Sequence, residues 1–266
     1  MNISSVKLAY FSPTKTTQKI LEAIAQGVEY NDVGHIDLTP PDSRTRTFED
    51  FNQDLVIIGA PVYGGRLAGE AVKRISMLKG HYTPAVVVVL YGNREYEDAL
   101  LELKDLAIKL GFVPVAGGAF IGEHSYTKPE FPLSAGRPHS QDLEKAMGFG
   151  KAIRRKMDAI KDIKSQDPID VPGHFPYKDH KPSSNESAST LEDICIACGT
   201  CAAICPTAAI MINERVETDS TLCIRCCACV KSCPTQARVM ESSRIDKIVK
   251  WLSENYSVPK QPETFI

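Results

Sequence analysis

The chain lacks several features that would assign it at once to a large class of proteins. Its longest conspicuous apolar run, Ala85 to Leu90, is far shorter than the roughly 20 residues that span a bilayer. The first residues do not combine a basic segment with an apolar core, as a secretory signal does. Lys plus Arg is 31 and Asp plus Glu is 33, a formal net charge of -2. We therefore expect a cytoplasmic protein that binds neither nucleic acid nor a membrane.

Common catalytic motifs are missing as well. The sequence has no G-x-G-x-x-G, so a dedicated nicotinamide-dinucleotide fold is unsupported. It has no H-E-x-x-H and no nucleophile elbow, the signatures of zinc peptidases and serine hydrolases.

Cysteine is absent from the first 194 residues, and all nine cysteines lie between Cys195 and Cys233. A secreted disulfide scaffold is small and evenly cross-linked. A single dense cluster in an intracellular chain instead indicates metal or iron–sulfur ligation.

The cysteines form a tandem repeat in which each half reads C-x2-C-x2-C-x3-C-P, and Cys195 recurs as Cys223. This is the pattern of bacterial two-cluster ferredoxins, in which the fourth cysteine of each run ligates the other cluster. We expect two [4Fe–4S] clusters, the first on Cys195, Cys198, Cys201 and Cys233, and the second on Cys223, Cys226, Cys229 and Cys205. Zinc is the rival interpretation, but it needs no such triple spacing. The ninth cysteine, Cys227, matches Gly199 and is expected to be a free, buried thiol.

Residues 1–164 alternate strand-like and helix-like segments. The expected strands are Val6–Phe11, Val33–Leu38, Leu55–Ala60, Ala85–Leu90 and Val113–Phe120. The expected helices are Thr17–Val28, Gly69–Lys79, Asp98–Leu110 and Ser140–Lys164. Five such βα units predict an α/β domain with a five-stranded parallel sheet wrapped by helices.

The remaining chain divides into three parts. Residues 165–190 are rich in proline and serine and predict a linker, and its residues Phe175 and Tyr177 could dock on a domain and anchor it. Residues 191–240 hold the cysteine repeat and predict a small α+β domain. Residues 241–266 predict an amphipathic helix and a tail.

Three loops follow the expected strands at one edge of the sheet, where α/β domains bind ligands. The first, Ser12 to Thr17, offers hydroxyls and backbone N–H groups at a helix start, and Lys15 adds a charge. This arrangement suits a phosphate, although the loop taken alone slightly favours an ordinary Ser/Thr N-cap. The other two, Pro61 to Arg66 and Tyr91 to Tyr96, each place glycine beside an aromatic residue. Together they predict a flat aromatic ligand that carries a phosphate.

The loops resemble those of the flavodoxins, whose phosphate loop T/S-x-T-G-x-T is matched by Ser12, Thr14 and Thr17, with Lys15 in place of glycine. The resemblance implies that FMN stacks between Tyr63 and Tyr96. The other residues implied in cofactor binding are Lys15, Thr16, Pro61, Gly64, Gly65, Tyr91, Gly92 and Asn93. With the cysteine repeat, the chain resembles the flavodoxin–ferredoxin fusion proteins of anaerobic bacteria and archaea.

Glu123 and His124 follow the last expected strand, at the same edge of the sheet. They could contact the flavin or a substrate, and His124 could donate a hydrogen bond or a proton. A surface histidine without a role is the alternative.

We expect an electron carrier that relays single electrons between two [4Fe–4S] clusters and FMN and that serves redox protein partners. The alternative is an FMN-dependent reductase of a small molecule that receives electrons through its ferredoxin domain, with His124 as the catalytic residue. A redox sensor is a third reading, for which no DNA-binding element is visible. A long linker also permits exchange of domains between chains, and hence a homo-oligomer.

Overall fold

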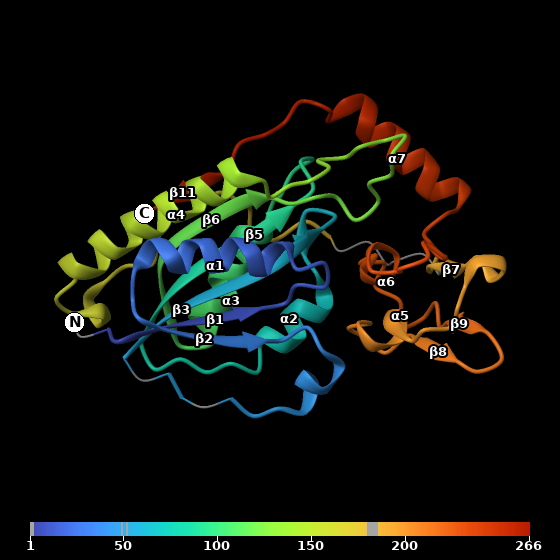
Figure 1. The fold of residues 1–266 in the computed structure, drawn as a ribbon. Coiled ribbons are helices and arrows are strands. Elements are labelled where there is room, and N and C mark those ends of the chain that lie inside the picture. The colour runs from blue at the N-terminus through green and yellow to red at the C-terminus, as the bar shows by residue number, and fades with distance from the viewer. Residues whose placement is uncertain (1–2, 49, 52, 180–185) are drawn as a thin grey trace.

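A computed structural model describes residues 3–48, 50–51, 53–179 and 186–266 of the chain. Its first part is a twisted sheet covered by helices on both faces (Figure 1). Five strands are parallel, in the order β2-β1-β3-β5-β6. Their bounds are β1 Ser5–Tyr10, β2 Asp32–Asp37, β3 Asp54–Tyr63, β5 Thr83–Tyr91 and β6 Phe112–Ile121. The predicted five-stranded parallel sheet is confirmed, and its strand order is the flavodoxin-like doubly wound one.

Strand β3 shows how the sequence directs this packing. Val56 and Ile58 join the core beneath helices α2 and α3, whereas Leu55 and Ile57 join the core beneath α1 and α4. The continuous apolar run is therefore buried on both faces, as parallel strands require. The helices are α1 Thr16–Val28, α2 Gly69–Ile75, α3 Ala99–Lys109 and α4 Ser140–Ala159. Short 3-10 helices lie at Pro41–Thr45 and Ile163–Ser165.

Two antiparallel strands extend the sheet beyond the prediction. Strand β4, Arg66–Leu67, forms a hairpin with the end of β3. Strand β11, Glu263–Phe265, pairs with the outer edge of β6. The C-terminal tail thus returns to the first domain (Figure 1), which a local sequence pattern does not reveal.

The cysteine region forms a separate small core. It contains two antiparallel sheets of two strands each, β7 with β10 and β8 with β9, and two single-turn helices. Its elements are β7 Ser189–Thr190, a 3-10 helix Glu192–Ile194, α5 Thr200–Ala203, β8 Ile210–Ile212, β9 Val216–Thr218, α6 Ala228–Lys231 and β10 Arg238–Val239. Helix α7, Ser243–Asn255, packs on this core through Ile245, Val249 and Leu252. The Ser242 hydroxyl caps the helix by accepting a hydrogen bond from the Ile245 amide at 3.1 Å.

The segment predicted as a linker lies against the first domain over much of its described length. Ile169 and Val171 are buried in the core beneath α3, and the Ile169 amide donates to the Pro114 carbonyl at 3.0 Å. The Tyr177 hydroxyl donates to Asp105 at 2.6 Å, whereas Phe175 is 79% exposed. Of the two anchors suggested by the sequence, Tyr177 contacts the domain. Residues 180–185 of this segment lie outside the described residues.

No helix in the described part of the chain is long and apolar enough to cross a membrane.

Candidate functional site

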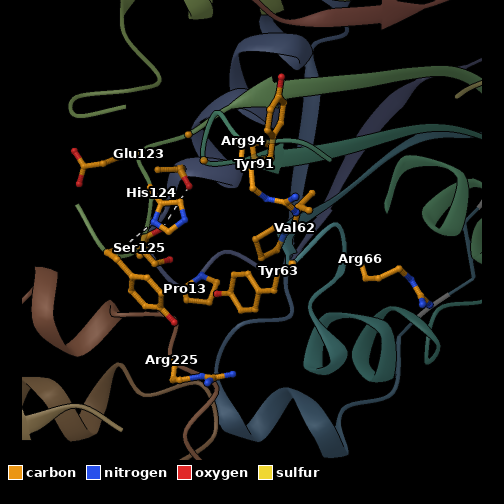
Figure 2. Close-up of a pocket in the computed structure, with 18 of the residues that line it drawn as sticks. Pro13, Val62, Tyr63, Arg66, Tyr91, Arg94, Glu123, His124, Ser125 and Arg225 are labelled. Atoms are coloured by element: carbon orange, nitrogen blue, oxygen red, sulfur yellow. Dashed lines mark hydrogen bonds between the residues drawn. The ribbon is translucent and has the colours of Figure 1, made fainter. Parts of the chain in front are cut away.

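A cavity of about 460 Å³ opens at the carboxyl edge of the parallel strands. It is lined by the ends of β1, β3, β5 and β6 and also by residues of the cysteine region and α7. Its volume lies within the range of roughly 300–1,000 Å³ that is usual for ligand and cofactor sites. In Figure 2, Glu123, His124 and Ser125 lie on one side of it and Val62 and Tyr63 on the other.

The phosphate loop has the geometry that an anion requires. Ser12, Thr14, Thr16 and Thr17 all line the cavity. Thr16 and Thr17 begin α1, where the first amides have no helical carbonyl to bind. The Thr17 hydroxyl is buried without a hydrogen-bond partner, so an acceptor supplied by a ligand would satisfy it. This orphaned donor fits a bound phosphate.

Lys15 shows why the flavodoxin pattern has glycine at this position. Its φ is 61°, in the left-handed region that disfavours side chains. The loop therefore keeps the backbone that glycine would adopt, although lysine occupies the position. The Lys15 side chain is exposed and does not line the cavity. Its ammonium group therefore does not lie where the sequence predicts it, against a phosphate in the cavity.

The second loop contributes Pro61, Tyr63 and Gly64 to the cavity wall, but not Gly65. Gly65 has a φ of 89°, and a Cβ there would lie 2.1 Å from a Glu97 oxygen. Its role is to permit this close approach of the chain. Burial raises the pKa of Tyr63 well above its usual value, so its ring presents a neutral phenol to the cavity.

The third loop differs most from the prediction. Tyr91 and Gly92 line the cavity, whereas Asn93 and Tyr96 do not. The Tyr96 ring is 6% exposed and packs on Tyr91 with centroids 5.4 Å apart. The Tyr96 hydroxyl donates to Glu263 of β11 at 2.9 Å. The structure therefore corrects the stacking role expected for Tyr96, because this ring faces the core and the tail.

Asn93 is likewise turned toward the C-terminal segment. Its side-chain amide donates to the carbonyls of Tyr256 and Val258 at 2.7 and 2.9 Å, and its oxygen accepts from the Lys260 amide at 2.8 Å. The expected flavin contacts of Tyr96 and Asn93 fail for the same reason. A C-terminal segment more than 150 residues away in the sequence packs against this loop and binds both side chains.

His124 and Glu123 both line the cavity. Burial, reinforced by Lys231 and Arg94, lowers the pKa of His124 to about 4. Its Nδ1 accepts from the Tyr126 amide at 3.1 Å, which leaves Nε2 to carry the proton of the neutral ring. Burial opposes the ionisation of Glu123, but hydrogen bonds from Lys231 and Gly136 lower its pKa. His124 is thus a neutral hydrogen-bond donor, and Glu123 is an ion-pair partner of α6.

The four cysteines expected to hold the second cluster all line one small cavity, which Cys227 lines as well: Cys205, Cys223, Cys226 and Cys229. The pKa of Cys226 is raised to about 12, first by burial and then by the neighbouring Cys229, Cys205 and Cys223. Cys205 is therefore close to the other run, as the crossover pattern requires. A cube takes one thiolate per iron, and these four cysteines around one cavity fit such a group.

In the first set, Cys198 and Cys233 come from opposite halves of the repeat and interact. Hydrogen bonding with Thr200 lowers the pKa of Cys198, and the nearby Cys233 opposes this by raising it. Cys198 is exposed, whereas Cys195 and Cys233 are partly buried and Cys201 is buried.

The backbone repeats as well as the sequence. Three pairs of residues adopt positive φ in both halves, each pair separated by the repeat length: Ala197 and Arg225, Gly199 and Cys227, Ala208 and Gln236. Such turns fold each run back on itself. Cys227 is buried, and desolvation raises its pKa well above its usual value.

The two regions meet at the cavity itself. Ile224 and Arg225, which lie between Cys223 and Cys226 in the sequence, line the cavity together with Tyr63. Arg225 and Tyr63 are labelled in Figure 2. Besides burial, Cys226, Cys227 and Cys223 contribute to the raised pKa of Tyr63, so the second cysteine set adjoins this ring. Sequence analysis missed Arg225 because only the packing of the two regions brings it to the cavity.

A buried arginine strengthens this junction. Arg74 of α2 is 1% exposed and donates to the Leu38 and Pro40 carbonyls at 2.6 and 2.9 Å. Its other terminal nitrogen donates to the carbonyl of Pro206, next to Cys205. An arginine buried in one region therefore bonds directly to the ligand loop of the other.

Comparison with known proteins supports the two-part organisation. Residues 194–237 match the family described as 4Fe-4S dicluster domain. The chain therefore combines an α/β domain of flavodoxin-like strand order with a region that matches a 4Fe-4S dicluster domain. No curated protein sequence matches it.

Solved structures align with the flavodoxin-like part. A flavodoxin from the domain Archaea is 15% identical, with 58% of this chain and 99% of that chain covered and a TM-score of 0.35. Flavodoxin 2 from Bacillus cereus is 16% identical, with 57% and 99% covered and a TM-score of 0.42. An NADH:FMN oxidoreductase in its apo form is 16% identical, with 56% and 89% covered and a TM-score of 0.41.

Proposed function

We propose that the chain binds FMN in the cavity and two [4Fe–4S] clusters on its eight repeat cysteines, and that it relays electrons between them and redox protein partners. FMN exchanges one or two electrons and a cluster exchanges one, so FMN and a cluster together would couple one-electron transfer to two-electron transfer. The protein's own contribution is to bind, position and shield these groups.

The phosphate loop supports FMN most directly. Ser12, Thr14, Thr16 and Thr17 would hold the phosphate, with the orphaned Thr17 hydroxyl as one donor. Tyr63 would contact the ring from one side. His124 would donate from Nε2, because its pKa of about 4 keeps it neutral at neutral pH. A neutral imidazole of such low pKa is a poor general acid at that pH, so these residues favour the relay over the reductase.

The junction between the two regions carries the proposal. The ligand loop between Cys223 and Cys226 forms part of the cavity wall through Ile224 and Arg225. A cluster on Cys205, Cys223, Cys226 and Cys229 would therefore be the nearer one to the cavity. The first set, which includes the exposed Cys198, would serve the partner protein. Electron transfer weakens steeply with distance, so this adjacency is what a relay requires.

Cofactor analysis of the anaerobically purified chain tests the proposal. We expect about eight iron atoms per chain, as two four-iron cubes, and one FMN. Stoichiometric zinc with little iron would contradict the cluster assignment.

Thr14→Glu tests the flavin site independently of the clusters. It places a carboxylate against the phosphate, where two like charges repel strongly when desolvated. We expect the variant to lose FMN and to keep its iron. Unchanged FMN content in this variant would contradict the phosphate site.

A further inference from the structure

Helix α7 has one aromatic residue that its own packing does not explain. Its buried face consists of Ile245, Val249 and Leu252. Trp251 lies outside that stripe, is 47% exposed and lines the cavity. Large apolar side chains gain stability from burial, and the fold leaves about half of this one uncovered.

Several contacts fix the position of Trp251 relative to the first domain. Its ring meets that of Tyr256 edge-on, with centroids 5.2 Å apart. The Tyr256 carbonyl accepts from Asn93, and Lys260 pairs with Glu95. The loop that carries Asn93 thus holds the end of α7 beside the cavity.

The same contacts take an aromatic ring away from the cavity. Tyr96, expected on the outer side of the ligand, is buried against Tyr91 and bonded to Glu263. Among the described residues that line the cavity, the aromatic side chains other than Tyr63 are Tyr91, His124, Tyr126 and Trp251. Tyr91 packs on Tyr96, and His124 and Tyr126 pack on each other with centroids 5.3 Å apart. Trp251 is the most exposed of the four.

We infer that Trp251 is a flavin-binding residue, and that the C-terminal helix supplies the outer aromatic wall in place of Tyr96. The inference rests on the proposed binding of FMN in this cavity. Aromatic rings stack on flat heterocycles in offset or edge-on geometries, and indole offers the largest such surface. The third loop then acts indirectly, because it holds the helix that carries the ring.

The chain contains one tryptophan, so the fluorescence of Trp251 can be followed without a contribution from other tryptophans. FMN would be titrated into flavin-depleted chain that retains its iron, with flavin and tryptophan emission recorded together. We expect Trp251 emission to be quenched as FMN binds, with one midpoint for both signals. Trp251→Ala should raise the dissociation constant for FMN about 10-fold or more, the scale of one stacked base. The dissociation constant of Trp251→Phe should lie between those of the natural chain and Trp251→Ala.

Phe175→Ala is the matched control, because this aromatic residue is 79% exposed and does not line the cavity. It should bind FMN like the natural chain. The iron content of each variant reports whether the cysteine region and α7 are folded. An unchanged dissociation constant in Trp251→Ala with normal iron would overturn the inference and leave the flavin proposal standing. Failure of the natural chain to bind FMN would overturn the proposed function itself.

Discussion

Cys227 can be distinguished from the proposed cluster ligands around it by its backbone conformation and its place in the repeat. It occupies the position of Gly199 in the repeat, and both residues have positive φ, 58° and 82°. Glycine adopts this conformation at no steric cost. The position is therefore set by the turn of the ligand loop, and a thiol is not required there.

Replacement of Cys205 tests the crossover at the level of the ligand. We expect Cys205→Ala to lose about half of the iron, one of two cubes. Adding Cys226→Ala should cause little further loss, because both residues serve the same cluster, whereas adding Cys198→Ala should remove the remaining iron. Such non-additivity identifies residues that act as a unit. Iron per chain is the measurement.

Cys227→Gly is the control for this series. The substitution reproduces the residue of the first half of the repeat, so both clusters should remain. Loss of half of the iron in this variant would assign Cys227 as a ligand and refute the pairing.

The neutral state of His124 predicts how stability depends on pH. Its folded pKa of about 4 lies below the ordinary value of 6.5, so the unfolded chain binds a proton in this interval that the folded chain does not. The free energy of unfolding should therefore fall as the pH drops from about 6.5 to about 4, by on the order of 3 kcal/mol.

His124→Gln should remove this part of the pH dependence, measured by denaturant unfolding of the flavin-free chain. An identical pH profile for the natural chain and His124→Gln would contradict a neutral, desolvated imidazole.

At the scale of elements, hydrophobic pattern predicted the central sheet well. The runs Leu55–Ala60 and Ala85–Leu90 are the middles of β3 and β5, and the helix expected at Thr17–Val28 begins one residue earlier. These elements are determined by nearby residues and by burial on both faces of the sheet. Strand β11 and the positions of Tyr96 and Asn93 depend on contacts between distant segments, which no local pattern contains.

Asn93 is the residue that joins the third loop to the end of α7. We expect Asn93→Ala to lower the free energy of unfolding by about 2–3 kcal/mol, at about 1 kcal/mol for each of its hydrogen bonds. FMN affinity should fall in the same direction as in Trp251→Ala, because the helix end is released. Denaturant unfolding and flavin titration measure the two effects.

Asn213→Ala is the matched control, since Asn213 is exposed between β8 and β9. It should change neither quantity. A variant of Asn93 with natural stability would contradict the stabilising role given to its three hydrogen bonds.

At the scale of the whole molecule, the contact between the two regions predicts the kinetics of the relay. Ile224 packs against the core of the flavodoxin-like part, and Arg74 bonds to Pro206. The cavity and the second cysteine set therefore face each other within one chain. We expect electrons to pass from reduced clusters to bound FMN at a rate that does not change across a dilution series of the full-length chain.

Stopped-flow absorption of the flavin, after rapid anaerobic mixing with a reductant, would measure this rate. A rate proportional to protein concentration would mean that the regions meet by collision between molecules, and the intramolecular relay would be refuted.

Strand β11 has a consequence for the order in which the molecule is assembled during synthesis. It covers the outer edge of β6 with residues 263–265, so the cysteine region is an insertion between two segments of one sheet. The ribosome delivers the chain from its N-terminus, and the edge of β6 stays open until the whole cysteine region has emerged. Closure of the sheet can thus follow the loading of iron, and cleavage within residues 165–190 alone would leave the cysteine region attached to the sheet through its C-terminal strand.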